Sequence, residues 1–128
     1  MGKLGEAHFG HLPVWVGGNA YFNGATICKH EKDYLEDKDN KVEISLTDKD
    51  GKLLLSTNLY SFLKDFKTGI ISTECLGKAF EPEQRFENPD GTEIIFDRDF
   101  FGAHRGLNTL PGPFADAEEA GSVLWSDK

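Results

Sequence analysis

The chain has 128 residues, with 22 acidic and 14 basic side chains, a formal net charge of -8 and an isoelectric point of about 4.9. This length fits one domain with one core. We therefore expect residues 1–128 to form a single β domain, which is either a complete unit or a subunit or fragment of a larger enzyme. The acidic balance disfavours binding to nucleic acid or to an anionic membrane surface, because both require a basic footprint.

Targeting signals are not evident in the sequence. No apolar run approaches the ~20 residues of a membrane span, and residues 1–8 lack the apolar stretch of a signal peptide. We therefore expect a cytoplasmic protein, or a secreted one if the chain is a mature fragment. Cys28 and Cys75 lie far apart without a CxxC motif, and we expect two buried free thiols in preference to a disulfide or a metal site.

Short apolar runs near the start of the chain are separated by Gly17-Gly18 and Asn23-Gly24. Asn-Gly favours a tight turn because both residues accept a positive φ. The pattern predicts three short strands, near 13–16, 19–22 and 25–28. The charged stretch 29–41 then predicts a solvated loop or a short exposed helical turn, in which Tyr34 and Leu35 are the only candidates for burial.

The clearest pattern in the chain is a β-hairpin between residues 42 and 59. Apolar and polar residues alternate on both sides of the turn sequence Asp48-Lys49-Asp50-Gly51, which is typical of half-buried antiparallel strands. The alternation places Leu46 and Leu55 on the core face, so we expect both side chains to be largely buried.

Short strands and long loops are expected in the remainder of the chain. Residues 61–66 suit a single helical turn, and Asn88-Pro89-Asp90-Gly91 is a turn sequence. Further strands are expected near 69–73, 92–96 and 122–125. Because no helix longer than two turns is indicated, the predicted fold class is all-β.

Candidate catalytic chemistry is concentrated in residues 97–106. If the preceding strand continues, Asp97 and Asp99 point to one face with their Cα atoms roughly 6.5–7 Å apart, a reach at which two carboxylates can hydrolyse a glycosidic bond. Alternatively, both carboxylates cap backbone amides and pair with neighbouring arginines. His104 and Arg105 are candidates for binding sugar hydroxyls, and local loop packing is the alternative for them.

Aromatic side chains provide the other binding candidates. Trp15 and Tyr21, together with Phe22 and Trp125, could stack on a sugar ring, because aromatic faces suit the C–H faces of pyranoses. The alternative is that they fill the core. The histidines show no metal-ligand spacing and no nucleotide-binding glycine motif occurs, so we expect neither a metal nor a cofactor.

A longer pattern runs through residues 74–115. It comprises an Asp, an aromatic, a Gly and an Arg, then a Pro/Gly stretch and a last aromatic, here Asp99, Phe101, Gly102, Arg105 and Phe114. This order resembles the closing region of bacterial right-handed parallel β-helix proteins that degrade plant polysaccharides, with xylosidase- and arabinofuranosidase-like glycoside hydrolases nearest. The resemblance implies the terminal part of a parallel β-helix. The antiparallel hairpin at 42–59 departs from a β-helix coil and would be an addition to it, and an independent small β-sandwich is the alternative.

The function implied by this resemblance is part of a glycoside hydrolase acting on xylo- or arabino-oligosaccharides. Residues 13–28 and 97–106 would lie nearest the sugar, and 13–28 would also contact another protein chain or a second copy. The resembled enzymes keep their catalytic carboxylates on mid-helix coils. A non-catalytic carbohydrate-binding β-sandwich is the alternative function, and an interaction module without a ligand is a third.

Overall fold

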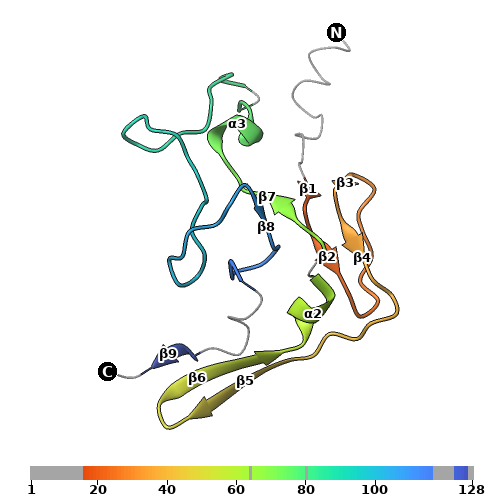
Figure 1. Cartoon of the computed structure of the whole chain (residues 1–128). Helices are drawn as coiled ribbons and strands as arrows, with labels where there is room; N and C mark the ends of the chain where they lie inside the picture. Colours follow the sequence, from red (N-terminus) through yellow and green to blue (C-terminus); the bar gives the residue numbers. More distant parts are fainter. Residues whose placement is uncertain (1–15, 64, 80, 117–122, 127–128) are drawn as a thin grey trace.

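Small sheets and irregular segments make up most of this protein. The structure, a computed structural model, describes residues 16–63, 65–79, 81–116 and 123–126. Within these ranges the strands form one three-stranded and three two-stranded sheets, and the helices are short (Figure 1). The predicted all-β class is therefore confirmed. None of the described helices has the length and apolar character needed to cross a membrane.

Four two-residue strands form two parallel pairs near the start of the described chain. These are β1 (Val16–Gly17) with β3 (Glu31–Lys32), and β2 (Ala20–Tyr21) with β4 (Leu35–Glu36). The paired residues are 15 positions apart in the sequence in both pairs. The segment from β3 to β4 therefore runs beside the segment from β1 to β2 in the same direction.

Of the predicted strand near 13–16, only Val16 lies within the described residues, and it begins β1. The strand predicted near 19–22 corresponds to β2, whereas no strand forms at 25–28. Instead, β3 and β4 form within residues 31–36 and pair with β1 and β2. These residues lie in the stretch that we expected to be a solvated loop or a helical turn. That expectation was wrong because long-range pairing, not an apolar run, specifies these strands. Tyr34 is exposed there and Leu35 is half-buried.

The expected hairpin is present and is the longest regular element of the described residues. Strand β5 (Ile44–Lys49) pairs antiparallel with β6 (Lys52–Thr57), and β9 (Val123–Ser126) adds to the other edge of β6. Asp50 and Gly51 form the two-residue connection with φ values of 54° and 71°. Two consecutive positive φ values match the twist of antiparallel strands, which explains why this sequence turns here.

Burial in the hairpin differs from the prediction. Leu46 lies opposite Leu55, on the shared face that the alternation predicted, but Leu46 is 58% exposed. Leu55 is half-buried and packs against the core. The hairpin extends past the core (Figure 1), and β5 is the outer strand of its sheet with every residue exposed. The alternation therefore predicted correctly that Leu46 and Leu55 share a face of the sheet. It did not predict that the Leu46 side chain remains exposed on that face.

The core lies next to the base of the hairpin. Helix α2 (Leu59–Leu63) contributes Tyr60 and Leu63, which pack with Leu110 and Phe114. The Thr57 hydroxyl accepts the Leu59 N–H at 3.1 Å, so this helix begins two residues before the predicted turn. Strands β7 (Thr68–Gly69) and β8 (Asn108–Thr109) pair beside the core.

Residues 70–96 extend from the core as an arm (Figure 1). Helix α3 (Thr73–Leu76), which we did not predict, lies in it, and the expected strands at 69–73 and 92–96 are reduced largely to isolated bridges. The buried Thr73 hydroxyl donates to the Phe86 carbonyl at 2.6 Å and accepts the Ile94 N–H at 2.8 Å.

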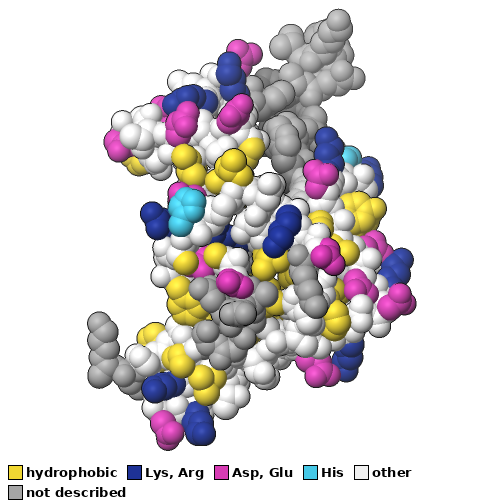
Figure 2. Space-filling model, in the orientation of Figure 1, with side chains coloured by type: hydrophobic (Ala, Val, Ile, Leu, Met, Phe, Trp, Pro, Cys, Tyr) yellow, Lys and Arg dark blue, Asp and Glu magenta, His cyan; other side chains and the backbone are white. Residues whose placement is uncertain are grey.

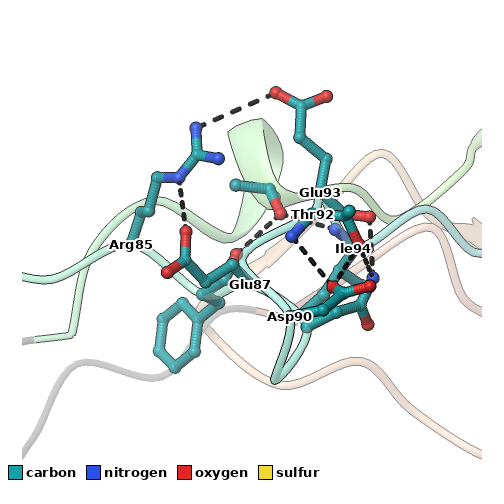
Figure 3. A network of polar contacts seen from close by, with 9 residues as sticks. Arg85, Glu87, Asp90, Thr92, Glu93 and Ile94 are labelled. Atoms are coloured by element: carbon teal, nitrogen blue, oxygen red, sulfur yellow. Dashed lines mark hydrogen bonds and ion pairs between the residues drawn. The ribbon is translucent and has the colours of Figure 1, made fainter.

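Polar contacts hold the tip of this arm together (Figure 3). Arg85 Nε donates to Glu87 at 3.0 Å, and the Asp90 carboxylate accepts both the N–H and the hydroxyl of Thr92, at 3.0 and 2.7 Å. These bonds to Thr92 lower the pKa of Asp90. The expected turn at 88–91 is closed by the Gly91 N–H, which donates to the Asn88 carbonyl at 2.8 Å.

The two cysteines correct a further expectation. Cys28 and Cys75 are free, as predicted, but both are exposed and not buried. Cys28 lies in an irregular segment and Cys75 in the short helix α3, and in both places little of the described chain covers the side chain.

Candidate functional site

A groove of about 820 Å³ lies between the N-terminal strands, the base of the arm and the segment around β8. Figure 2 shows exposed apolar side chains in patches between charged ones on one face of the molecule. The groove is lined by residues 17–20, by residues between Leu59 and Cys75, by Phe96 and by residues between Arg105 and Gly112. Segments far apart in the sequence therefore build it.

The groove combines an aromatic surface with amide and charged side chains. Phe96 is 61% exposed and lines the groove together with Ile71. The amide and charged side chains of the lining are Asn19, Asp33, Lys67, Arg105 and Asn108. A few polar groups beside an apolar surface suit a ligand that carries both hydroxyl groups and a C–H face.

Gly18 allows one wall of this groove to approach its neighbour. Its φ is +72°, and a Cβ at this position would lie 3.1 Å from the Thr68 Cγ2 atom. A larger residue would be both strained and crowded. The glycine therefore lets the turn after β1 lie close to β7.

A buried carboxylate lies behind the N-terminal wall. Glu31 is buried and accepts hydrogen bonds from Asn19 Nδ2 and from the Tyr21 hydroxyl, both at 2.8 Å. The bond to Glu31 raises the pKa of Tyr21. Tyr21, a predicted sugar-stacking residue, therefore uses its hydroxyl to hold Glu31, and it is not among the residues that line the groove.

The predicted catalytic pair separates into two environments. The Asp97 carboxylate lies 3.4 Å from His104 Nε2 and 3.9 Å from Arg98 Nε, at the molecular surface. The backbone of this segment folds back on itself, since the Arg105 N–H donates to the Asp97 carbonyl at 2.7 Å. His104, a predicted substrate-binding residue, is thus a partner of Asp97.

The Asp99 carboxylate is occupied by backbone amides. One oxygen accepts the N–H groups of Phe101 and Ala103 at 2.9 and 2.7 Å, and the other accepts the N–H of Ala115 at 3.1 Å. These bonds close the 99–103 turn and fasten it to the chain beside Phe114. The geometry matches the capping alternative for this residue, and the catalytic role of the pair stays a prediction.

Arg105 both lines the groove and organises the segment below it. Its Nε donates to the Thr109 hydroxyl at 3.1 Å, and its Nη2 donates to the Leu110 carbonyl. These bonds hold β8 next to the core. Arg105 is half-buried, so a ligand in the groove would meet a guanidinium that the protein already positions.

The other aromatic candidates lie elsewhere. Phe22 packs against the core, Trp125 is exposed on β9, and Trp15 lies outside the described residues. Among the residues that the structure describes, no group of three metal-ligating side chains comes together.

Sequence reasoning missed Asn19, Glu31, Phe96 and Asn108. Glu31 lies in an acidic stretch, Asn19 and Phe96 lie in irregular segments, and Asn108 lies in the two-residue strand β8. Nothing in their local sequence distinguishes them, because the groove and the Glu31 cluster arise only from long-range pairing.

These features define an all-β protein with an open groove of mixed polarity. No protein-family model matches the chain, and no curated protein matches its sequence. Among solved structures, the chain is similar to the one described as the complex of XylC with xylose. The TM-score is 0.76 and the sequence identity 31%, over 88% of this chain and 18% of that chain. The chain thus spans less than a fifth of the protein that it resembles.

Proposed function

We propose that the chain forms part of a glycoside hydrolase that acts on plant-type xylo- or arabino-oligosaccharides, and that it helps to form the sugar-binding cleft. The observation that carries this proposal is the similarity to the XylC–xylose complex, at 31% identity over 88% of the chain. Residues 74–115 independently resemble the closing region of polysaccharide-degrading β-helix proteins.

The parallel pairs support placing the N-terminal strands in a β-helix. β1 and β2 pair in parallel with β3 and β4 at the same 15-residue offset, and stacked coils of a parallel β-helix produce such a repeated offset. We propose that this part of the chain is one such coil and that the antiparallel hairpin is an addition to it.

The groove is the proposed sugar site. It brings residues 17–20 next to Arg105, so it joins the two segments that we expected to lie nearest the sugar. In this proposal Phe96 stacks on the ring, and the Asn19 and Asn108 amides bond its hydroxyls. A second protein chain, or a further part of the same enzyme, would complete the cleft.

For the chemistry of hydrolysis we propose Asp97 in preference to Asp99. Asp97 follows the lining residue Phe96 and does not itself line the groove. The Asp97 side chain contacts His104 and Arg98 at the surface, whereas three backbone amides occupy the oxygens of Asp99. A carboxylate that organises a turn cannot leave its partners without loss of the turn. Asp99 would therefore position Asp97 and the following loop.

A non-catalytic carbohydrate-binding role is the second candidate. It is favoured by the engagement of Asp99, because this bonding leaves the 97–99 segment with one carboxylate in place of the pair that hydrolysis uses. Both proposed functions place a sugar in the groove. They differ in whether the bound sugar is hydrolysed and not in whether it binds.

The binding test uses the purified chain and titrates it with xylose and xylobiose, followed by NMR chemical shifts. Phe96→Ala removes the exposed ring of the groove and should weaken binding roughly three- to tenfold. Phe86→Ala is the matched control, because Phe86 is an exposed ring on the same arm but does not line the groove. Equal losses in both variants, or shifts confined to residues outside the groove, would contradict the assignment.

A further inference from the structure

The outer edge of β5 is an unpaired stretch of backbone. Strand β5 pairs with β6 on one side, and no other strand of the described ranges pairs with it. All six of its residues are exposed. Ile44 and Leu46, at 63% and 58% exposure, are two of its four uncharged residues. A long edge with apolar side chains is a template for pairing with another strand.

The register of the hairpin shows which backbone groups face outward. Lys49 and Lys52 flank the two-residue turn and form a hydrogen-bonded pair in such hairpins. At the other end, the Glu43 N–H donates to Asn58 Oδ1 and the Glu43 carbonyl accepts the Asn58 N–H. Odd-numbered residues of this strand therefore face β6, and the N–H and C=O groups of Ile44, Leu46 and Asp48 face outward.

We propose that this edge pairs antiparallel with β5 of a second copy of the chain, with Leu46 opposite Leu46 of the second copy. In this register the three outward-facing residues of each strand meet the three of the other. Each such pair exchanges two backbone hydrogen bonds. The two three-stranded sheets then join into one continuous sheet.

Charge complementarity selects this register over its neighbours. Glu43 stands opposite Lys49 of the second copy, twice by symmetry. These are non-hydrogen-bonded pairs, in which the side chains approach most closely. A shift of two residues in one direction places Lys49 opposite Lys41 of the second copy, and the opposite shift leaves Glu43 facing Gly51. Only the proposed register pairs opposite charges at both ends.

The same pairing extends an apolar face. Leu46 lies opposite Leu55, and Leu53 lies opposite Trp125, so these side chains share one face of the sheet. Joining two sheets through β5 places Leu46 against Leu46 of the second copy at the centre of that face. Ile44 lies opposite Asp48 of the second copy and diagonal to its Leu46. Side chains that are exposed in a single chain thereby gain apolar neighbours.

The test measures the oligomeric state by sedimentation velocity across a series of protein concentrations. The proposal expects a reversible monomer–dimer equilibrium. Glu43→Lys and Lys49→Glu each replace two attractive cross-strand pairs by two repulsive ones, so each should raise the dissociation constant on the order of tenfold. The double variant Glu43→Lys/Lys49→Glu restores both pairs with their signs exchanged and should return the constant to about the original value.

This exchange distinguishes pairing between copies from effects within one chain. Glu43 and Lys49 are six positions apart on one strand, which corresponds to roughly 20 Å, so they do not contact each other within a copy. Asp39→Lys and Lys29→Glu are matched controls, because both residues are exposed outside the hairpin and make the same charge changes. A chain that stays monomeric at every concentration would overturn the proposal. A dimer that the double variant does not restore, or that the controls weaken equally, would overturn it as well.

Discussion

The hairpin and the core are stabilised by different kinds of contact. In the hairpin, six consecutive residue pairs form a regular backbone ladder, while all side chains of β5 remain exposed. Around Phe114 the backbone is mostly irregular, and Phe114 is buried against Tyr60, Leu63 and Leu110. Regular hydrogen bonding and burial are therefore separated in this protein.

In the core, side chains replace the missing backbone ladder. Phe114 stacks on Phe101 with ring centroids 5.5 Å apart and meets the Tyr60 ring at 5.9 Å. Asp99 and Arg105 bond backbone groups on either side of this cluster. Backbone N–H and C=O groups outside helices and sheets must form hydrogen bonds with other partners. The Asp99 and Arg105 side chains provide such partners, so they stabilise the core together with the aromatic rings.

The largest expected effect is that of removing the central ring of the core. Phe114 is 1% exposed, so Phe114→Ala should lower the free energy of unfolding by about 3–5 kcal/mol. Urea denaturation followed by fluorescence measures this loss. A loss below about 1 kcal/mol would show that the core does not hold the molecule together.

The sequence predicted those elements that are specified locally. The alternation around Leu46 and Leu55, with Asp50-Gly51 between the strands, was sufficient to predict the hairpin and the face that the two leucines share. Helix α3 escaped prediction, although Ser72 caps it and the Cys75 N–H donates to the Ser72 hydroxyl. Such a short helix carries no period that a sequence could show.

Elements that depend on distant partners could not be predicted. The parallel partners at 31–36 are charged and carry no strand signal. For the site, the sequence indicated Arg105 and the region near residues 17–20. It gave no sign of Phe96 or Asn108, because their position in the groove depends on how the arm and β8 pack.

The same Asp→Asn substitution at Asp99 and at Asp97 compares a carboxylate that bonds backbone amides with one that does not. Asp99→Asn places an amide N–H₂ against at least one backbone N–H, so we expect a loss of about 1–3 kcal/mol in the free energy of unfolding. Asp97→Asn weakens an exposed pair with His104, for which about 0–1 kcal/mol is expected. Equal losses would contradict the difference between the two environments.

The same two variants test catalysis when activity is measured per folded molecule. If Asp97 is the acid or base of a hydrolase, Asp97→Asn should lower the rate on aryl-xyloside and aryl-arabinoside substrates about 10²–10⁴-fold without a matching loss of stability. Full activity of folded Asp97→Asn would remove this residue from the catalytic hypothesis. Binding without turnover in the unsubstituted chain would favour the carbohydrate-binding alternative.

The smallest expected effect compares two leucines that face each other across the hairpin. Leu55→Ala removes a half-buried side chain that packs on the core, so we expect a loss of about 1–2 kcal/mol. Leu46→Ala removes its exposed partner and should change the free energy of unfolding by less than about 0.5 kcal/mol. Both are measured by urea denaturation at protein concentrations where the chain is monomeric, so that pairing between copies does not contribute. A larger loss for Leu46 than for Leu55 would mean that the outer face of the hairpin is covered within a single chain, and the separation of regular backbone from buried core would then fail.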